Sequence, residues 1–218
     1  MQSIKPISEH LGDLDKLADA YAQSYRKISA EYKEPVEMEA YDDEYFISRI
    51  KRFAAEDMCF VLSSGGDVAG FARFNDIPDY YKKTPHRDLD SQTLEGAEYN
   101  LARRIRFNEG APDLDGRTAI LNQIYLMPKF QKRGMGGKLV RAGLDEIRAD
   151  YTHLIVEYNL NNHFAEGFYK NKLGMIKIAD TMDFDGIIRG ENGRPTFFIS
   201  PVGIRWQAIA KVRENLAR

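Results

Sequence analysis

A glycine-rich basic turn at residues 131–139, Gln-Lys-Arg-Gly-Met-Gly-Gly-Lys-Leu, is the part of the chain best suited to chemistry. It follows the apolar run 124–128 and opens a helical pattern, so we expect a strand, a turn and a helix in succession. The first N–H groups of a helix lack partners within the helix, and the helix dipole is positive at that end. Because glycine has no Cβ, a phosphate can approach its backbone closely. The turn therefore predicts a bound pyrophosphate and a nucleotide-containing cofactor.

Three phosphate-binding patterns compete for this turn. A Walker loop fails because Lys132 stands where its first glycine belongs and Leu139 stands where its Ser or Thr belongs. A dinucleotide fingerprint fails because the same Leu139 replaces its third glycine. The third pattern, [QR]-x-x-G-x-[GA], is met by Gln131, Gly134 and Gly136.

That third pattern resembles motif A of the GNAT superfamily of acyl-CoA N-acyltransferases. The resemblance continues at residues 162–175, Asn-His-Phe-Ala-Glu-Gly-Phe-Tyr-Lys-Asn-Lys-Leu-Gly-Met, which are similar to the family's motif B, N-x-x-A-x-x-F-Y-x-x-x-G-F. Met175 replaces the usual aromatic residue of motif B. Two motifs in the expected order are far more specific than either motif alone.

The resemblance implies an α/β fold with a mixed, mostly antiparallel central sheet of about seven strands and helices on both faces. We expect a single N-acetyltransferase domain over residues 1–218, with an insertion at 77–117 and a C-terminal helix at 204–218. The two central strands, 118–126 and 154–158, are expected to splay apart.

Hydrophobic periodicity predicts the remaining elements. Helices are expected at 11–28, 41–54, 94–107 and 162–172, and strands at 3–7, 58–62, 68–74, 175–182 and 196–200, with a polar connection at 183–195. Trp206, Ile209, Val212 and Leu216 recur at helical spacing. This C-terminal stripe must dock either on the sheet or on another subunit.

The splayed strands would leave backbone N–H and C=O groups unpaired, and the pantetheine arm of acetyl-CoA would pair with them. The resemblance assigns the following residues to this cosubstrate: Tyr125, Leu126, Met127, Gln131, Lys132, Arg133, Gly134, Met135, Gly136, Gly137, Lys138, Asn162 and Phe168. Lys132, Arg133 and Lys138 would add positive charge near the phosphates. Alternatively, these three side chains only form a solvated face of the helix. Asn162 is open to two roles, contact with CoA or water and the N-cap of the motif B helix.

The reaction implied is acetyl transfer from acetyl-CoA to a primary amine by direct attack in a ternary complex. An alkylamine is mostly protonated at pH 7, so a base or a water chain must take a proton. Tyr169 is the candidate acid for the departing thiolate, or else only a hydrogen-bond donor to the sulfur. Asn122 and Gln123 occupy the region where some family members carry a glutamate, and neither can accept a proton near pH 7. Glu157 is the candidate base, with water-mediated deprotonation equally open.

Two alternatives to this activity remain open. One is a CoA-binding or sensing domain of the same fold with little turnover. The other is an acyltransferase with a longer acyl donor. The four histidines show no metal-ligand spacing, so no metal is expected.

Composition and charge limit the kinds of partner that we expect this chain to bind. The net charge of −2 gives no bias toward nucleic acid, and without an apolar run of membrane-spanning length no membrane partner is expected. A single cysteine, Cys59, is consistent with a reducing cytoplasm. The acidic segment 31–44, with Tyr32, Tyr41 and Tyr45, either attracts a cationic acceptor amine or forms a solvated surface. The acceptor would be a small molecule or a peptide, and a homodimer is left open.

Overall fold

The computed structural model of the chain describes most of its 218 residues. The described residues are 2–32, 43–55, 58–77, 105–160, 162–181, 186–189, 195–199 and 202–218. They form two compact units, one made of Met1–Asn75, Leu121–Ala149 and Arg213–Arg218 and the other of Asp76–Ile120 and Asp150–Val212. Within these ranges, no helix has both the length and the apolar character needed to cross a membrane.

The first unit is built from strands in the order β1-β2-β3-β5 and from the helices around them. Its elements are β1 (Gln2–Pro6), the 3-10 helix η1 (Ile7–Asp13), α1 (Leu14–Tyr32), α2 (Asp43–Ala54), β2 (Cys59–Ser64), β3 (Asp67–Asp76), β5 (Thr118–Leu126), the 3-10 turn η5 (Pro128–Phe130) and α4 (Met135–Glu146). Strands β2 and β3, which cover the strands expected at 58–62 and 68–74, pair as an antiparallel hairpin. Its two-residue loop is Gly65-Gly66, where both residues adopt positive φ, +65° and +88°, the conformation that a tight hairpin turn requires.

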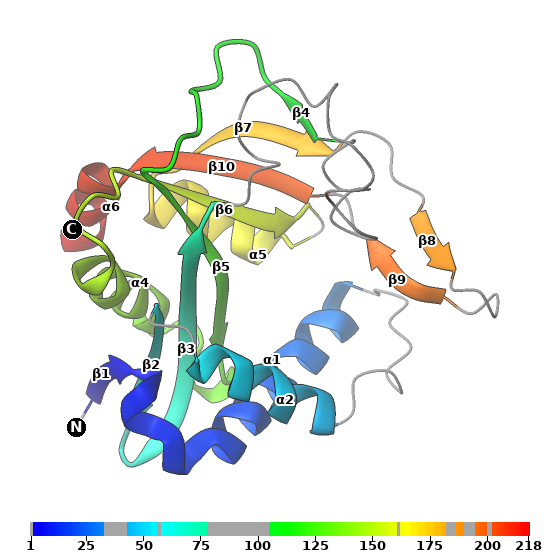
Figure 1. Cartoon of the computed structure of the whole chain (residues 1–218), viewed down its shortest axis with the longest axis vertical. Coiled ribbons are helices and arrows are strands. Elements are labelled where there is room, and N and C mark those ends of the chain that lie inside the picture. Colours follow the sequence, from blue (N-terminus) through cyan, green and yellow to red (C-terminus); the bar gives the residue numbers. More distant parts are fainter. Residues whose placement is uncertain are drawn as a thin grey trace. The chain divides into compact units, whose positions relative to one another are not determined.

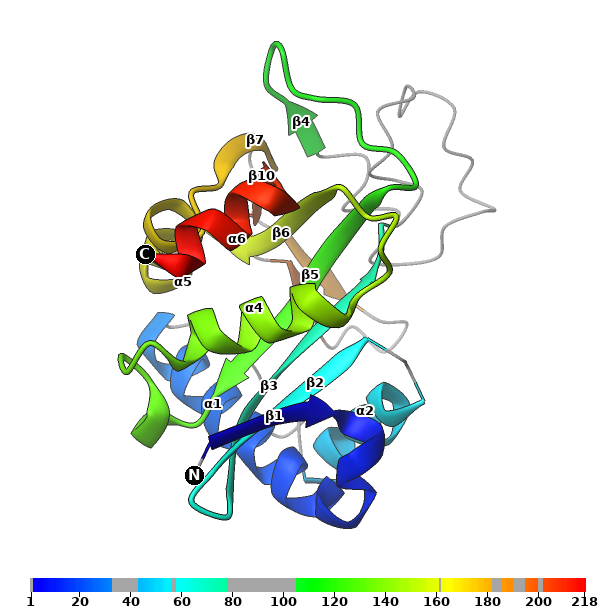
Figure 2. The same cartoon turned by 90° about the vertical axis from the view of Figure 1, so that its left-hand side faces the viewer.

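Successive side chains of β2 and β3 point to opposite sides of the sheet, and both sides are packed in this unit. Cys59 and Val61 belong to the core formed with α1 and α2. Phe60 points to the opposite face, where its ring packs on Phe74 of β3 and close to Gly143 of α4. The strands are therefore covered by α1 and α2 on one face and by α4 on the other, as Figure 2 shows.

The second unit has strands in the order β6-β10-β7-β4 (Figure 1). Its elements are β4 (Ile105–Phe107), β6 (His153–Asn159), α5 (His163–Gly167), the π-helical turn η6 (Phe168–Lys172), β7 (Ile176–Thr181) and β10 (Val202–Ala208), with β8 (Gly186–Arg189) and β9 (Pro195–Ile199) in a separate two-stranded sheet. Helix α6 (Ile209–Ala217) follows β10.

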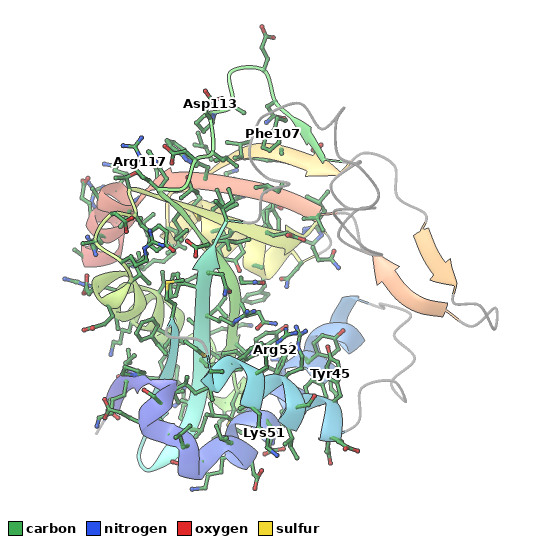
Figure 3. The ribbon with its side chains drawn as sticks, viewed as in Figure 1. Tyr45, Lys51, Arg52, Phe107, Asp113 and Arg117 are labelled. Atoms are coloured by element: carbon green, nitrogen blue, oxygen red, sulfur yellow. The ribbon has the colours of Figure 1, made fainter. Side chains whose placement is uncertain are left out.

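Alternation along β10 also separates two faces. Ile204 is fully buried in a core with Ile155 and Ile178, and the partly buried Trp206 packs against the same core. Phe107, which is labelled in Figure 3 with Asp113 and Arg117, packs there from β4. Arg205 lies on the other face, which α5 approaches.

The predicted fold class, a mixed and mostly antiparallel sheet with helices, is confirmed by the strand pairings and by structural relatives described below. The strand at 118–126 is found at the predicted residues. The predicted splaying concerns the relation between the two units and stays a prediction, as does the single domain over 1–218.

Three expectations about elements are wrong. The helix at 204–218 begins only at Ile209, because 202–208 form strand β10 between β6 and β7. The helix at 94–107 cannot include 105–107, which pair with β7 as strand β4. The connection at 183–195 contains strand β8, and the predicted last strand pairs with β8 instead of joining the larger sheet.

Parts of several predictions lie outside the described residues. These include most of the insertion at 77–117, with residues 94–104 of the helix expected there, and the central part of the acidic segment 31–44, including Tyr41.

Candidate active site

The turn after β5 has the backbone that an anion site needs. Lys132 and Gly134 both adopt left-handed φ, +60° and +73°. Gly134 is the N-cap of α4 and gives the helix no side-chain cap. A Cβ added at Gly134 would meet no protein atom within 4 Å, so the space beside this residue is open to a ligand.

The backbone donors of the turn are only partly used by the protein. Gln131 N–H donates to the carbonyl of Pro128 at 3.3 Å, and Lys138 N–H donates to the carbonyl of Gly134 at 3.3 Å. In the described chain, Lys138 is the first residue of α4 whose N–H has a backbone partner. The donors left at the start of the helix are those of Met135, Gly136 and Gly137, which therefore fit a phosphate. We predicted phosphate donors over 131–137, and the N–H of Gln131 is corrected because it already pairs with Pro128.

The last residues of β5 are more fully paired than the sequence predicted. Met127 N–H donates to the carbonyl of Ala69 on β3 at 2.9 Å. The Leu126 carbonyl accepts from Ser24 Oγ at 2.7 Å and from Gln131 Nε2 at 2.9 Å. The prediction of unpaired groups is thus wrong for the N–H of Met127 and the C=O of Leu126.

Tyr125 contributes a carbonyl oriented toward β3. A Cβ added at Gly70 would lie 2.1 Å from this oxygen, so only glycine permits the close approach. Since backbone groups of successive residues in a strand point to alternate edges, Tyr125 and Met127 address β3 and Leu126 addresses the opposite edge. Of the three predicted pantetheine partners, Leu126 is the one whose backbone groups point away from β3.

A polar seam joins α1 to β5 and the turn. Here the term α1 seam means the pairs Tyr21–Gln123, Ser24–Leu126 and Lys27–Gln131. Gln123 Nε2 donates to Tyr21 Oη at 3.1 Å, and Lys27 Nζ donates to Gln131 Oε1 at 2.9 Å. Residues spaced three apart share one face of a helix, which is why α1 reaches all three sites. Lys27 thus adds a cation beside the turn.

The cations predicted in motif A differ in their surroundings. Lys132 and Arg133 are exposed, whereas Met135 and Gly137 are buried. Lys138 Nζ donates to Gln2 Oε1 of β1 at 2.9 Å. The ammonium of Lys138 is therefore engaged with the neighbouring strand, and Lys27 from α1 is the cation that sequence reasoning missed.

In the second unit, Tyr169 lies in the π-helical turn η6 and is 6% exposed. Its ring packs on Tyr158 at 5.8 Å and on Phe168 at 5.5 Å between ring centroids. Burial raises the pKa of Tyr169 far above its usual range, because the charged phenolate would lose its hydration. The phenol is therefore neutral throughout the physiological pH range and can donate a hydrogen bond.

The other motif B residues take distinct positions. Asn162 caps α5, since its Oδ1 accepts from Ala165 N–H at 2.8 Å. Of the two roles open to Asn162, the N-cap is the one observed. Phe168 is half-buried at the start of η6. Glu157 is half-buried on β6, opposite Ile204 of β10.

Two further sequence expectations concern residues of the first unit. Asn122 is exposed and its Nδ2 donates to Asn75 Oδ1 at 3.3 Å. Tyr45, labelled on α2 in Figure 3, already has the Arg49 guanidinium 5.8 Å from its ring centroid. Its proposed contact with a cationic acceptor therefore faces competition from a residue of the same helix.

Glu166 of motif B joins a charged cluster that the sequence motifs did not reveal. Arg205 Nη2 donates to Glu166 Oε1 at 2.8 Å, and Tyr158 Oη donates to the same oxygen at 3.4 Å. The guanidinium holds the pKa of Glu166 below its usual range, while burial raises that of Tyr158. Arg205 is distant in sequence from both partners, so periodicity gave no signal for it.

Among the described residues, no group of three or more His, Cys, Asp or Glu side chains could hold a metal ion.

Comparison with known proteins identifies the family. The model of the acetyltransferase (GNAT) family matches residues 18–175, more than half of the chain. The chain therefore belongs to the GNAT acetyltransferase family. None of the curated proteins matches it.

Solved structures share the fold at low sequence identity. An N-acetyltransferase from Staphylococcus aureus Mu50 is 15% identical, with a TM-score of 0.54 over 96% of this chain and 99% of that one. The PaiA N-acetyltransferase from Thermoplasma acidophilum, in complex with coenzyme A, is 16% identical, with a TM-score of 0.52 over 95% and 99%. YncA from Salmonella typhimurium, a putative acetyltransferase with its cofactor acetyl-CoA, is 13% identical, with a TM-score of 0.54 over 96% and 94%.

Proposed function

We propose that this chain transfers an acetyl group from acetyl-CoA to a primary amine of a small molecule or peptide. The observation that carries the proposal is the start of α4, where left-handed Gly134 leaves open space beside backbone donors that no side chain caps. Relatives of the same fold bind coenzyme A or acetyl-CoA, which supports the choice of cosubstrate.

The cosubstrate would be held mainly by the first unit. Its diphosphate would accept hydrogen bonds from the N–H groups of Met135, Gly136 and Gly137. Lys27 and the exposed Lys132 and Arg133 would add positive charge. The pantetheine arm would run along the edge of β5 that Leu126 addresses. Because Ser24 and Gln131 already donate to the Leu126 carbonyl, the arm would have to displace one of them or use the N–H of the same residue.

The reaction would proceed by direct attack of the neutral amine. The amine lone pair forms the C–N bond at the thioester carbonyl carbon, and the C–S bond breaks with its electron pair leaving on sulfur. The nitrogen becomes positively charged as the C–N bond forms, and its extra proton passes to Glu157 or to water. Tyr169 donates a hydrogen bond to the departing thiolate and stabilises its charge. Because burial raises the pKa of Tyr169, the proton stays on the phenol and remains available for this hydrogen bond.

The test is a thiol-release assay with acetyl-CoA and a panel of primary amines, with mass spectrometry of the amine product. We expect stoichiometric thiol and N-acetylated amine for at least one acceptor. Panels of cationic and neutral amines identify the acceptor class, and longer acyl-CoA donors test the acyl group. Tight CoA binding without thiol release from any acetyl donor and amine would contradict the proposal and favour a CoA-sensing domain.

A further inference from the structure

Arg205 is a buried cation that the proposed chemistry does not use. It is 6% exposed and lies on β10, between Val156 of β6 and Lys177 of β7 in the strand register. A buried guanidinium loses its hydration, so the protein retains it only with good partners. Replacing a buried ion pair with apolar residues is often neutral or favourable for stability. A role beyond stability therefore has to be sought in what Arg205 contacts.

Arg205 holds the motif B segment at two points. Its Nη2 donates to Glu166 Oε1 at 2.8 Å, and its Nη1 donates to the carbonyl of Met175 at 3.0 Å. Glu166 stands three residues before Tyr169, a spacing that places both on one side of a helical segment. Met175 N–H in turn donates to the Tyr169 carbonyl at 3.0 Å. One side chain thus fixes the chain before and after Tyr169.

The same guanidinium also supports the ring next to Tyr169. Its Cζ lies 5.6 Å from the centroid of Tyr158, whose ring packs against Tyr169. Gly203 makes room for this arrangement, since a Cβ there would lie 2.7 Å from Tyr158 Cζ. Arg205 therefore reaches Tyr169 by backbone and by ring packing.

The backbone at Tyr169 needs such support. Phe168–Lys172 form a π-helical turn, in which Leu173 N–H bonds to the Phe168 carbonyl at 3.1 Å. Single π-helical turns are rare and often found at functional sites. The two contacts of Arg205, at Glu166 and Met175, lie on either side of this turn.

We propose that Arg205 is a positioning residue for acetyl transfer: by holding Glu166 and Met175 it fixes the orientation of the Tyr169 phenol. This inference rests on the proposed function, because it concerns the group that donates to the leaving thiolate. Arg205 acts through Tyr169 and does not itself touch the reacting atoms.

A double-mutant cycle on the full chain tests the coupling. We expect Arg205→Met to lower kcat about tenfold, with KM for acetyl-CoA within twofold, and Tyr169→Phe to lower kcat by about 100-fold. The double variant should be no slower than Tyr169→Phe, because Arg205 has nothing left to position. A double variant slowed by the product of the two factors, or an unchanged kcat for Arg205→Met, overturns the proposal.

Arg213→Met is the matched control. Arg213 also donates to a backbone carbonyl, that of Leu144, and pairs with a carboxylate, Asp145 at 3.3 Å. Both partners lie on α4, away from motif B in the sequence. We expect this variant to keep the wild-type kcat.

Two further readouts cover the other outcomes. If Arg205→Met does not fold, Arg205→Lys replaces it in the cycle, since an ammonium cannot span both Glu166 and the Met175 carbonyl as a guanidinium fork does. If the wild-type chain shows no turnover, which is the failure of the proposed function, tyrosine absorbance titration still decides the inference. Releasing Tyr169 in Arg205→Met should let one more tyrosine ionise near pH 10 than in Arg205→Met/Tyr169→Phe. Identical titrations of these two variants overturn the proposal.

Discussion

At the scale of single residues, Gly134 matters for two reasons, its left-handed backbone and the open space beside it. Its φ of +73° disfavours any side chain, and the space beside it is open. We expect Gly134→Glu to abolish CoA binding in isothermal titration calorimetry, because its carboxylate would enter the space proposed for the diphosphate.

Gly110→Glu is the control for backbone strain. Gly110 has a φ of +74° and also has open space around it. Each variant should lose about 1 kcal/mol of stability from the left-handed backbone, but only the variant at 134 should lose CoA. Equal loss of CoA binding in both variants would show that strain, and not the phosphate site, explains the effect.

Tyr169 offers a test that requires no substrate. Burial raises its pKa above the ordinary value of about 10, so neutral Tyr169 contributes stability that is fully present below pH 10. That contribution is lost as pH rises through the folded pKa. We expect the tyrosinate absorbance of the wild type and Tyr169→Phe to be equal up to about pH 10. A larger absorbance in the wild type at pH 10 would mean that the phenol is accessible.

Residue patterns located the turn and Tyr169 but missed Arg205. The turn was found because its signals are local: glycines, cations and the apolar run all fall within 124–139. Arg205 was missed because its importance comes from partners 30 and 39 residues away, Met175 and Glu166. No local pattern encodes such a pair.

At the scale of elements, the C-terminal strand shows how periodicity can mislead. Trp206, Ile209 and Val212 recur at helical spacing, yet the first of them lies on β10 and the other two lie on α6. Pairing with β6 and β7 on both edges decides the conformation of 202–208, because nonlocal strand pairing overrides weak local propensity. By contrast, β5 was predicted at its correct residues, although the polar Asn122 and Gln123 interrupt its apolar pattern.

The α1 seam makes α1 part of the proposed cosubstrate site. Lys27 lies beside the turn through Gln131, so its charge should act on a bound diphosphate. We expect Lys27→Met to weaken CoA binding about three- to tenfold, an effect on the order of 1 kcal/mol, and salt should reduce the difference. Fluorescence or calorimetric titration at two salt concentrations measures it.

Lys16→Met on the same helix is the matched control for Lys27. Lys16 is exposed and pairs with Asp13 at 2.7 Å. CoA affinity should be unchanged in this variant at either salt concentration. A loss as large as that of Lys27→Met would point to a general charge effect and remove Lys27 from the site.

Packing of α4 onto the strands depends on Gly143. A Cβ at this position would lie 2.3 Å from Phe74 Cε2 and 3.2 Å from Phe60 Cδ2. We expect Gly143→Ala to lower the free energy of unfolding by about 1–3 kcal/mol through overpacking, as measured by urea denaturation. Gly12→Ala, where a Cβ meets nothing within 4 Å, should stay within about 0.5 kcal/mol of the wild type.

At the scale of the whole molecule, cosubstrate binding should appear as thermal stabilisation. A ligand that binds only the folded state at 100 times its Kd adds about 2.7 kcal/mol. For a chain of this size, that free energy corresponds to a Tm increase of roughly 5–10 °C.

Fragments of CoA then identify the group that the chain recognises. If backbone donors at the start of α4 hold the diphosphate, 3′-dephospho-CoA should raise Tm nearly as much as CoA, because both carry that group. Pantetheine lacks the diphosphate and should produce little shift at the same concentration. Gly134→Glu should abolish the shifts of both nucleotides while leaving the small pantetheine effect unchanged. A pantetheine shift as large as that of CoA, or a full CoA shift in Gly134→Glu, would mean that the edge of β5 dominates binding and that the turn after it does not hold the diphosphate.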